Sequence, residues 1–243
     1  MLKSPFRYTF IISSPHEPED RLSNVELLQQ QIPRTILQPA IFPNQQKVPF
    51  LEKLRKKSGE RTGVTLNAGE IGVLLANRCI WRQIVHLKPN EEDIFLILES
   101  DSKINNYHVF REKAGLMMKG YDLFFFGGWT GRMMLKRSTI QVFDPPFKVG
   151  DPYIKTVCSG YGYAINLRAA KTLLQYTKKI AYPVDEFKKY LPANRLKIGG
   201  VVPELVSEQP GTTTIGHPNY KGFLFQSKMF LVHLRNSIVS YFS

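Results

Sequence analysis

The sequence predicts an α/β protein with a central, mostly parallel sheet in a single domain. Its clearest strand covers residues 94–98, five apolar residues in a row bounded by polar ones. A short apolar run of this kind is typical of a strand buried on both faces of a parallel sheet. The start of the chain agrees, because a strand over 6–12, a helix that begins near Glu17 and a strand over 32–36 form a β-α-β unit. At 243 residues, 43% of them hydrophobic, the chain can bury one sizeable core.

Two carboxylates follow the apolar strand directly. Glu99 and Asp101 flank Ser100 at its carboxyl end, and open α/β sheets bind ligands in the crevice at the carboxyl ends of their strands. On an extended backbone, residues two apart point to the same side, so both carboxylates could reach one divalent cation. The pattern therefore predicts a site for a metal ion and a nucleotide.

A long helix is predicted over residues 66–87. Asn67 is a good N-cap and Glu70 lies three residues later, as in a capping box. Glu70, Leu74, Asn77 and Trp81 fall on one line of this helix. Polar groups on a mostly buried helix need polar partners, so these residues are there either for capping and packing or for a binding site.

The rest of the chain alternates between strands and helices. We expect helices over 107–119 and 167–174, strands over 121–126, 159–166 and 201–206, and an irregular, turn-rich stretch over 138–157. Asp185 and Glu186 follow Pro183. They could begin a short helix, where acids are favoured, or supply carboxylate chemistry.

The chain is strongly basic, with a net charge of +13. This implies an acidic partner such as a phosphorylated substrate or an anionic lipid. Nucleic acid is not favoured, because no zinc-finger spacing or arginine-aromatic repeat is present. Residues 43–63 concentrate positive charge, either as a solvated loop or short helix or as a flap that faces an anionic acceptor or membrane.

Residues 222–243 mix apolar and basic side chains and could cap the domain or lie on a membrane surface. We therefore divide the chain into a domain over 1–221 and a helical, basic C-terminal segment over 222–243. Neither a membrane-spanning run nor a secretory signal is visible. These features predict a cytoplasmic protein that could be peripheral on the inner membrane.

Four blocks in order resemble glycosyltransferase family 25, the lipopolysaccharide and collagen β-galactosyltransferase family. They are residues 66–72 with Trp81, 96–101, 159–165 with 169–171, and 183–185. These are similar to the family's LTxGExGC…W helix, its LILEDD motif, its GxxGYxIS…AA segment and its PVD block, and Arg21 and residues 203–209 also fit. The sequence departs from the family at Val73, Asn77 and Ser100, where the family has cysteine, histidine and the central aspartate of EDD.

The resemblance implies a GT-A-like, Rossmann-like fold and an inverting transfer of a hexose, with galactose as first choice, from a UDP-sugar to a hydroxyl of a glycan. It also implies a divalent cofactor, Mn²⁺ or Mg²⁺, that offsets charge on the diphosphate leaving group. Glu99 and Asp101 are its candidate ligands, and His217 on a late polar loop could complete the shell through its imidazole. The candidate donor-binding residues are Ser13, Ser14, Arg21, Asn77, Trp81, Glu99, Ser100 and Asp101.

Direct displacement also needs a general base to take the proton of the acceptor hydroxyl. Asp185 is the first candidate, Glu186 the second and Glu70 the third. Two alternatives stay open: a non-catalytic protein that binds a glycan or membrane, with which Asn77 and Ser100 are compatible, and a transferase that uses UDP-glucose or UDP-xylose. Lipopolysaccharide or lipooligosaccharide suits a basic chain without a secretory signal better than collagen hydroxylysine, which requires a secretory route.

Overall fold

The computed structural model describes residues 4–43, 47–128, 133–157, 160–191 and 195–209. An eight-stranded sheet forms its centre, in the order β2-β1-β3-β8-β5-β9-β7-β6, and β4 and β10 form a separate two-stranded sheet. The strands are β1 (Tyr8–Ser13), β2 (Thr35–Pro39), β3 (Phe95–Glu99), β4 (Ser102–Ile104), β5 (Leu123–Phe125), β6 (Gln141–Asp144), β7 (Phe147–Gly150), β8 (Gly162–Ile165), β9 (Ile198–Val202) and β10 (Val206–Glu208).

Six strands of the large sheet run in one direction and two run against them. β1 is parallel to both β2 and β3, and β5 is parallel to β9. β8 is antiparallel to its neighbours β3 and β5, and β7 is antiparallel to β9 and β6, so β8 and β7 are the reversed pair. The predicted α/β class with a mostly parallel sheet is confirmed, although the apolar strand β3 has one parallel and one antiparallel neighbour.

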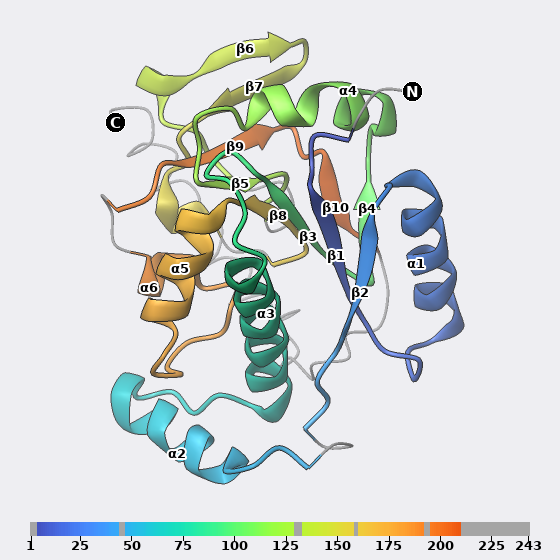
Figure 1. Ribbon diagram of the computed structural model, residues 1–243. Coiled ribbons are helices and arrows are strands. Elements are labelled where there is room, and N and C mark those ends of the chain that lie inside the picture. Colours follow the sequence, from blue (N-terminus) through green and yellow to red (C-terminus); the bar gives the residue numbers. More distant parts are fainter. Residues whose placement is uncertain (1–3, 44–46, 129–132, 158–159, 192–194, 210–243) are drawn as a thin grey trace, which may run out of the picture.

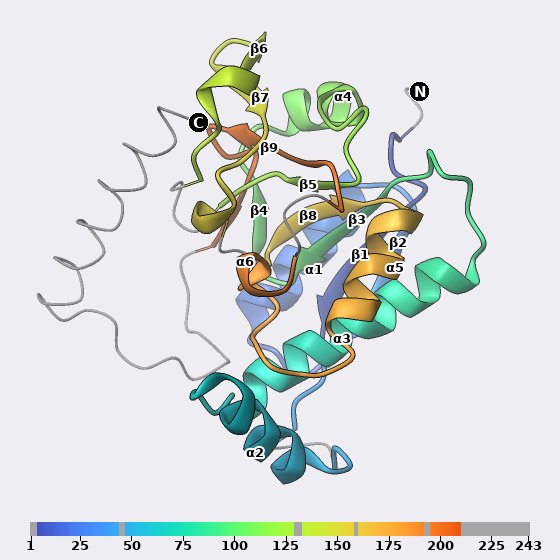
Figure 2. The same ribbon diagram turned by 90° about the vertical axis from the view of Figure 1, so that its left-hand side faces the viewer.

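Helices cover both faces of the sheet. In Figure 2, α3 and α5 lie together in front of the sheet and α1 lies behind it. Successive side chains of a strand point to opposite faces, so Phe95 and Ile97 of β3 enter one hydrophobic core and Leu96 and Leu98 enter the other. The helices are α1 (Glu19–Gln31), α2 (Leu51–Thr62), α3 (Ala68–His86), α4 (Tyr107–Met117), α5 (Leu167–Tyr176) and α6 (Phe187–Tyr190).

Two segments differ from the sequence-based expectation. The stretch 138–157, expected to be irregular, contains the β6–β7 hairpin, which extends the sheet through antiparallel pairing with β9. Its side chains lack clear alternation because β6 is an edge strand, and Val142 is 66% exposed. The stretch 201–206, expected to be one strand, is divided between the end of β9 and the start of β10. The basic stretch 43–63, for which a short helix was one of the expectations, contains the helix α2, which lies beyond the first turn of α3 (Figure 1).

The predicted capping box of α3 is present. The Asn67 Oδ1 atom accepts a hydrogen bond from the Glu70 N–H at 2.8 Å, and a Glu70 carboxylate oxygen accepts one from the Asn67 N–H at 2.8 Å. These two bonds satisfy backbone donors that the helix itself leaves unpaired. Among the described residues, no helix combines the length and apolar character needed to cross a bilayer. The C-terminal segment over 222–243 and the boundary at residue 221 lie outside the described residues.

A buried polar network joins α3 to β8. The Trp81 Nε1–H donates to the Tyr163 hydroxyl at 3.0 Å, and that hydroxyl donates to the Asn77 Oδ1 atom at 2.5 Å. The Asn77 amide donates in turn to the carbonyl of Val73 at 3.0 Å. Asn77, Trp81 and Tyr163 are all fully buried, so this network supplies the polar partners that the helix requires.

We expect Tyr163→Phe to lower the free energy of unfolding by about 1–3 kcal/mol, because it leaves a buried indole N–H and a buried amide oxygen unpaired. Urea unfolding followed by circular dichroism measures the change. Tyr8→Phe, on β1 of the same sheet, is the matched control, since that hydroxyl takes no part in the network. Equal stability of Tyr163→Phe and wild type would contradict this role.

Candidate active site

The candidate site lies where β3 ends. The strand stops at Glu99, and Ser100 and Asp101 form a turn that leads into β4. Glu99 and Asp101 therefore do not sit on one extended strand, as the spacing suggested, but on a strand end and a turn. β1 ends beside them, because Ile12 pairs with Glu99.

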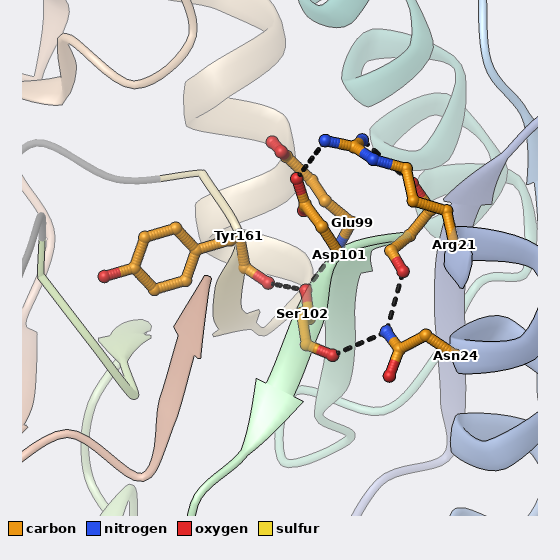
Figure 3. Close-up of polar contacts among 7 residues, drawn as sticks. Arg21, Asn24, Glu99, Asp101, Ser102 and Tyr161 are labelled. Carbon is orange, nitrogen blue, oxygen red and sulfur yellow. Dashed lines mark hydrogen bonds and ion pairs between the residues drawn. The ribbon is translucent and has the colours of Figure 1, made fainter. Parts of the chain in front are cut away.

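The side chains of Asn24 and Ser102 and the backbone carbonyl of Tyr161 hold this turn (Figure 3). The Asn24 amide of α1 donates to the carbonyl oxygens of Ser100 and Ser102, at 2.7 and 2.9 Å. The Ser102 hydroxyl accepts a hydrogen bond from the Glu99 N–H at 2.9 Å and donates to the carbonyl of Tyr161. With its backbone fixed on both sides, the turn presents its carboxylates in a defined arrangement.

The segment around β10 adds a third support. Glu208 of β10 pairs with Ser102 of β4. One residue later, the Gln209 N–H donates to the carbonyl of Asp101 at 2.8 Å, and its side-chain amide donates to Asn24 Oδ1 at 2.8 Å. The turn is thus assembled from three parts of the chain that are distant in sequence.

Arg21 supplies positive charge directly at the turn. Its Nη2 atom lies 2.8 Å from Asp101 Oδ2, and its Nη1 atom donates to the Ser100 hydroxyl at 3.4 Å. The other carboxylate oxygen of Asp101, Oδ1, is buried and has no hydrogen-bond partner among the described residues. Burial raises the pKa of Asp101 despite the opposing effect of Arg21, so the ion pair only partly offsets the cost of burying this carboxyl group.

Glu99 experiences the strongest crowding of negative charge. Burial, and then the carboxylates of Asp101, Asp185 and Glu208, raise its pKa to about 8, with Arg21 opposing. A carboxyl group whose pKa is raised by both desolvation and neighbouring acids marks a functional-site candidate. The acids around Glu99 therefore carry more negative charge than the single guanidinium of Arg21 offsets.

The turn has an acidic neighbour that the sequence analysis did not assign to the site. Glu17 lies on the loop after β1, hydrogen-bonded to Ser100, and burial raises its pKa. Its Oε2 atom is buried without a hydrogen-bond partner among the described residues. The only signal in the sequence is its place shortly after a strand end.

Asn24 and Glu208 were also missed. Asn24 follows Arg21 by three residues and therefore shares its helix face, which could have suggested a common site. Nothing in the local sequence of Glu208 points to β3, because it reaches the turn only through the pairing of β10 with β4.

Asp185 comes close to this acidic group, since its charge raises the pKa of Glu99. A Cβ atom placed on Gly160 would lie 2.9 Å from the Glu99 Oε1 atom and 3.7 Å from Val184. The segment that carries Asp185 thus packs against the same glycine as Glu99. The carboxylate of Glu186, the second candidate, pairs with the Lys188 ammonium at 3.1 Å.

Three other predicted residues have structural partners. Glu70 uses its carboxylate to cap α3, and Asn77 and Trp81 are fully buried and hydrogen-bonded to Tyr163. The structure therefore gives Asn77 and Trp81 a role in the core in place of the predicted contact with a donor. Their alignment on one helix line reflects the shared partner Tyr163.

The remaining predicted residues are Ser13 and Ser14, which the structure describes, and His217, which it does not. Ser13 and Ser14 are buried at the end of β1, next to Glu99, and the Ser14 hydroxyl accepts a hydrogen bond from the His16 N–H at 3.2 Å. Both serines thus lie beside the acidic turn, and their contact with a donor stays a prediction. His217 lies outside the described residues.

The residues at the turn are chemically suited to a divalent cation. The described residues contain no group of three or more histidine, cysteine, aspartate or glutamate side chains arranged to hold a metal ion. Glu99 and Asp101 nevertheless offer carboxylate oxygens, one of them the unpartnered Asp101 Oδ1 atom, in a site with excess negative charge. One or two carboxylates, completed by substrate phosphates, are a common setting for Mg²⁺.

We expect the metal-free protein to lose stability as the pH rises from about 5 to 8. Glu99 holds its proton more tightly in the folded protein, with a pKa of about 8, than at its ordinary value of 4.5. Its contribution is therefore full below the ordinary pKa and is lost as the pH rises through the folded pKa. Glu99→Gln stays neutral and should flatten this decline.

Melting curves in EDTA at several pH values measure this effect, since 1 kcal/mol shifts the Tm of a chain of this size by about 2–4 °C. Asp144→Asn on the distant strand β6 serves as the control and should keep the wild-type slope. An identical slope in Glu99→Gln and wild type would contradict the assignment.

Comparison with known proteins agrees with the resemblance. The sequence matches "Glycosyltransferase family 25 (LPS biosynthesis protein)" over residues 8–188, a span that contains Glu99, Asp101 and Asp185. No match was found among curated proteins. A solved mannose-1-phosphate geranyltransferase from Thermus thermophilus is similar at 12% identity and a TM-score of 0.41, over 82% of this chain and 75% of that chain, which is too distant to support a conclusion. The family match covers well over half of the sequence, and the chain belongs to glycosyltransferase family 25.

Proposed function

We propose that this glycosyltransferase moves a hexose, galactose as first choice, from a UDP-sugar to a hydroxyl of a lipopolysaccharide or lipooligosaccharide glycan, with inversion and with Mn²⁺ or Mg²⁺. The observation that carries the proposal is the position of Glu99 and Asp101. They stand together at the carboxyl end of β3, inside the region that matches the family, and this edge of an α/β sheet is where ligands bind.

The residues around β1 are suited to hold the donor. Ser13 and Ser14 end the strand next to Glu99, and Arg21 lies in the first turn of α1 with its guanidinium at Asp101. A guanidinium binds phosphate oxygens through paired N–H donors. Arg21 could therefore orient the diphosphate while it continues to hold the acidic turn.

Glu99 and Asp101 are the residues that would hold the divalent cation. When bound, the cation would offset the negative charge that develops on the departing diphosphate. The protein contributes the rest of the arrangement, because Asn24 and Ser102 fix the turn on which both carboxylates depend.

Asp185 is the proposed general base. Its negative charge raises the pKa of Glu99, and Val184 beside it packs against the same glycine as Glu99, so Asp185 is a carboxylate next to the acidic turn. It would take the hydroxyl proton as the new bond forms. Glu186 is the weaker candidate, because Lys188 already pairs with its carboxylate, and Glu70 is weaker still because it caps α3.

The lipid-linked acceptor would bring the protein to the cytoplasmic face of the inner membrane. Support comes from α2, on which Lys53, Lys56 and Lys57 are exposed and which follows Phe50, 75% exposed. Basic side chains near an exposed aromatic ring favour an anionic membrane surface. This peripheral attachment is part of the proposal.

A panel of UDP-galactose, UDP-glucose and UDP-xylose, assayed for hydrolysis and transfer with Mn²⁺ and with EDTA, tests the function. We expect Asp101→Asn to lower turnover by more than about 10–100-fold, the loss typical of disturbing even outer groups of a metal site. It should keep the wild-type circular dichroism spectrum, because asparagine has the same shape. Asp144→Asn is the matched control and should retain full turnover.

Full turnover in Asp101→Asn, or equal rates with Mn²⁺ and EDTA, would contradict the metal site. The second candidate function is a non-catalytic glycan-binding protein, favoured by the Arg21–Asp101 ion pair, which already supplies a cation to this carboxylate. Absence of UDP binding with Mn²⁺ in calorimetry, together with no turnover of any donor, would favour that candidate.

We expect Asp185→Asn to reduce transfer by about 10²–10⁴-fold, the usual contribution of a general base, while the affinity for UDP stays unchanged. Steady-state kinetics and calorimetry with UDP measure the two effects separately. Glu186→Gln provides the comparison and should retain most activity. If Asp185→Asn keeps wild-type kinetics while Glu186→Gln loses them, the two roles must be exchanged.

A further inference from the structure

A pocket of about 460 Å³ lies between α2, α3 and the segment that follows α5. Its walls include three cationic side chains, Arg61, Lys179 and Lys189, and two tyrosines, Tyr176 and Tyr182. No carboxylate is among the described residues that line it. The volume falls within the range of about 300–1,000 Å³ that is usual for small-molecule sites.

Two of the three cations of this pocket, Arg61 and Lys189, have contacts with groups other than carboxylates. The Arg61 guanidinium donates to the carbonyl of Ile180 at 2.9 Å and so ties α2 to the segment after α5. The Lys189 ammonium lies over the ring of Tyr182, 5.7 Å from its centroid. The neighbouring Lys188, in contrast, pairs with Glu186. The pocket therefore keeps its net positive charge, whereas the charge of the adjacent Lys188 is offset by Glu186.

The pocket is joined to the acidic group by a very short stretch of chain. Tyr182 lines the pocket, and Asp185, three residues later, acts on Glu99. Three residues span at most about 11 Å even when fully extended. Val184, between them, packs against Gly160 together with Glu99. A saccharide of a few rings could therefore occupy the pocket and reach Asp185.

We infer that this pocket binds a negatively charged substituent, a phosphate or a carboxylate, of the acceptor glycan. The inference rests on the proposed function and names the class of its acceptor: an anionic saccharide. Arg61, Lys179 and Lys189 would contact the anionic group through charge-assisted hydrogen bonds. Tyr176 and Tyr182 offer both ring surface and hydroxyl groups, which suits a sugar with apolar and polar faces.

Calorimetry with galactose 6-phosphate, galacturonate and neutral galactose tests this inference on the full chain. We expect the wild type to bind at least one of the anionic sugars more tightly than galactose, and the stronger ligand identifies phosphate or carboxylate as the recognised group. The variant Lys179→Gln/Lys189→Gln should bind that sugar about tenfold more weakly or worse, since hydrogen bonds to charged groups contribute this much. Lys171→Gln, exposed on α5 outside the pocket, should match the wild type.

Three results would overturn the inference. The first is equal binding of galactose and both anionic sugars, and the second is an equal loss of affinity in Lys171→Gln and in the double variant. The third is displacement of the anionic sugar by UDP, which would assign the pocket to the donor.

Hydrolysis of UDP-galactose without an acceptor separates this inference from the proposed function. If hydrolysis persists in the double variant while affinity for the anionic sugar falls, both stand. If the wild type hydrolyses no donor but binds the anionic sugar through Lys179 and Lys189, the pocket stands and the proposed transfer fails.

Discussion

Mutual repulsion among carboxylates at the end of β3 is the constraint on which the site depends. The strand is buried in two cores, one on each face, so its polar groups can gather only where it ends. Several acids meet there and Arg21 pairs with Asp101. Such an arrangement persists only when its backbone is held firmly and its charge is offset by protons or a cation. Asn24 and Ser102 provide the first, and the proposed metal ion would provide the second.

The cationic pocket lies near the acidic turn and carries the opposite charge. Lys179 and Lys189 line the pocket together with Tyr182, and Asp185, three residues after Tyr182, raises the pKa of Glu99. An anionic acceptor approaching this surface would be attracted to the pocket and repelled from the acids, so only its hydroxyl end would be directed toward Asp185. Complementary charge of this kind sets orientation and encounter rate more than affinity. The two charged regions would thus favour one direction of binding.

Local signals in the sequence predicted the fold well where they were strong. The apolar run of β3, the β-α-β start and the Asn67–Glu70 capping box all follow from spacing and residue type. The reversed direction of β8 and the β6–β7 hairpin depend on which strands become neighbours, and that choice is made by tertiary packing. The polar groups of Asn77 and Trp81 on a buried helix predicted that hydrogen-bond partners exist. The partner, Tyr163, could not be identified because it lies 86 residues from Asn77 and 82 from Trp81 in the sequence. Glu99 and Asp101 could be singled out because they lie two residues apart in the sequence, and their role in a metal site stays a prediction. Asn24 and Glu208 reach the turn only through tertiary contacts, so their local sequence did not reveal them.

The pairing of β10 with β4 has a consequence for the order of assembly. Gln209 donates to Asn24 across 185 residues of chain, and it also binds the carbonyl of Asp101. Contacts of such long sequence separation form late, because closing the intervening loop is entropically costly. On the ribosome, β1, α1 and β3 could meet well before residues 206–209 are made. The acidic turn would then reach its final geometry only when most of the chain is present, so its carboxylates would be held in place only after the surrounding sheet is complete.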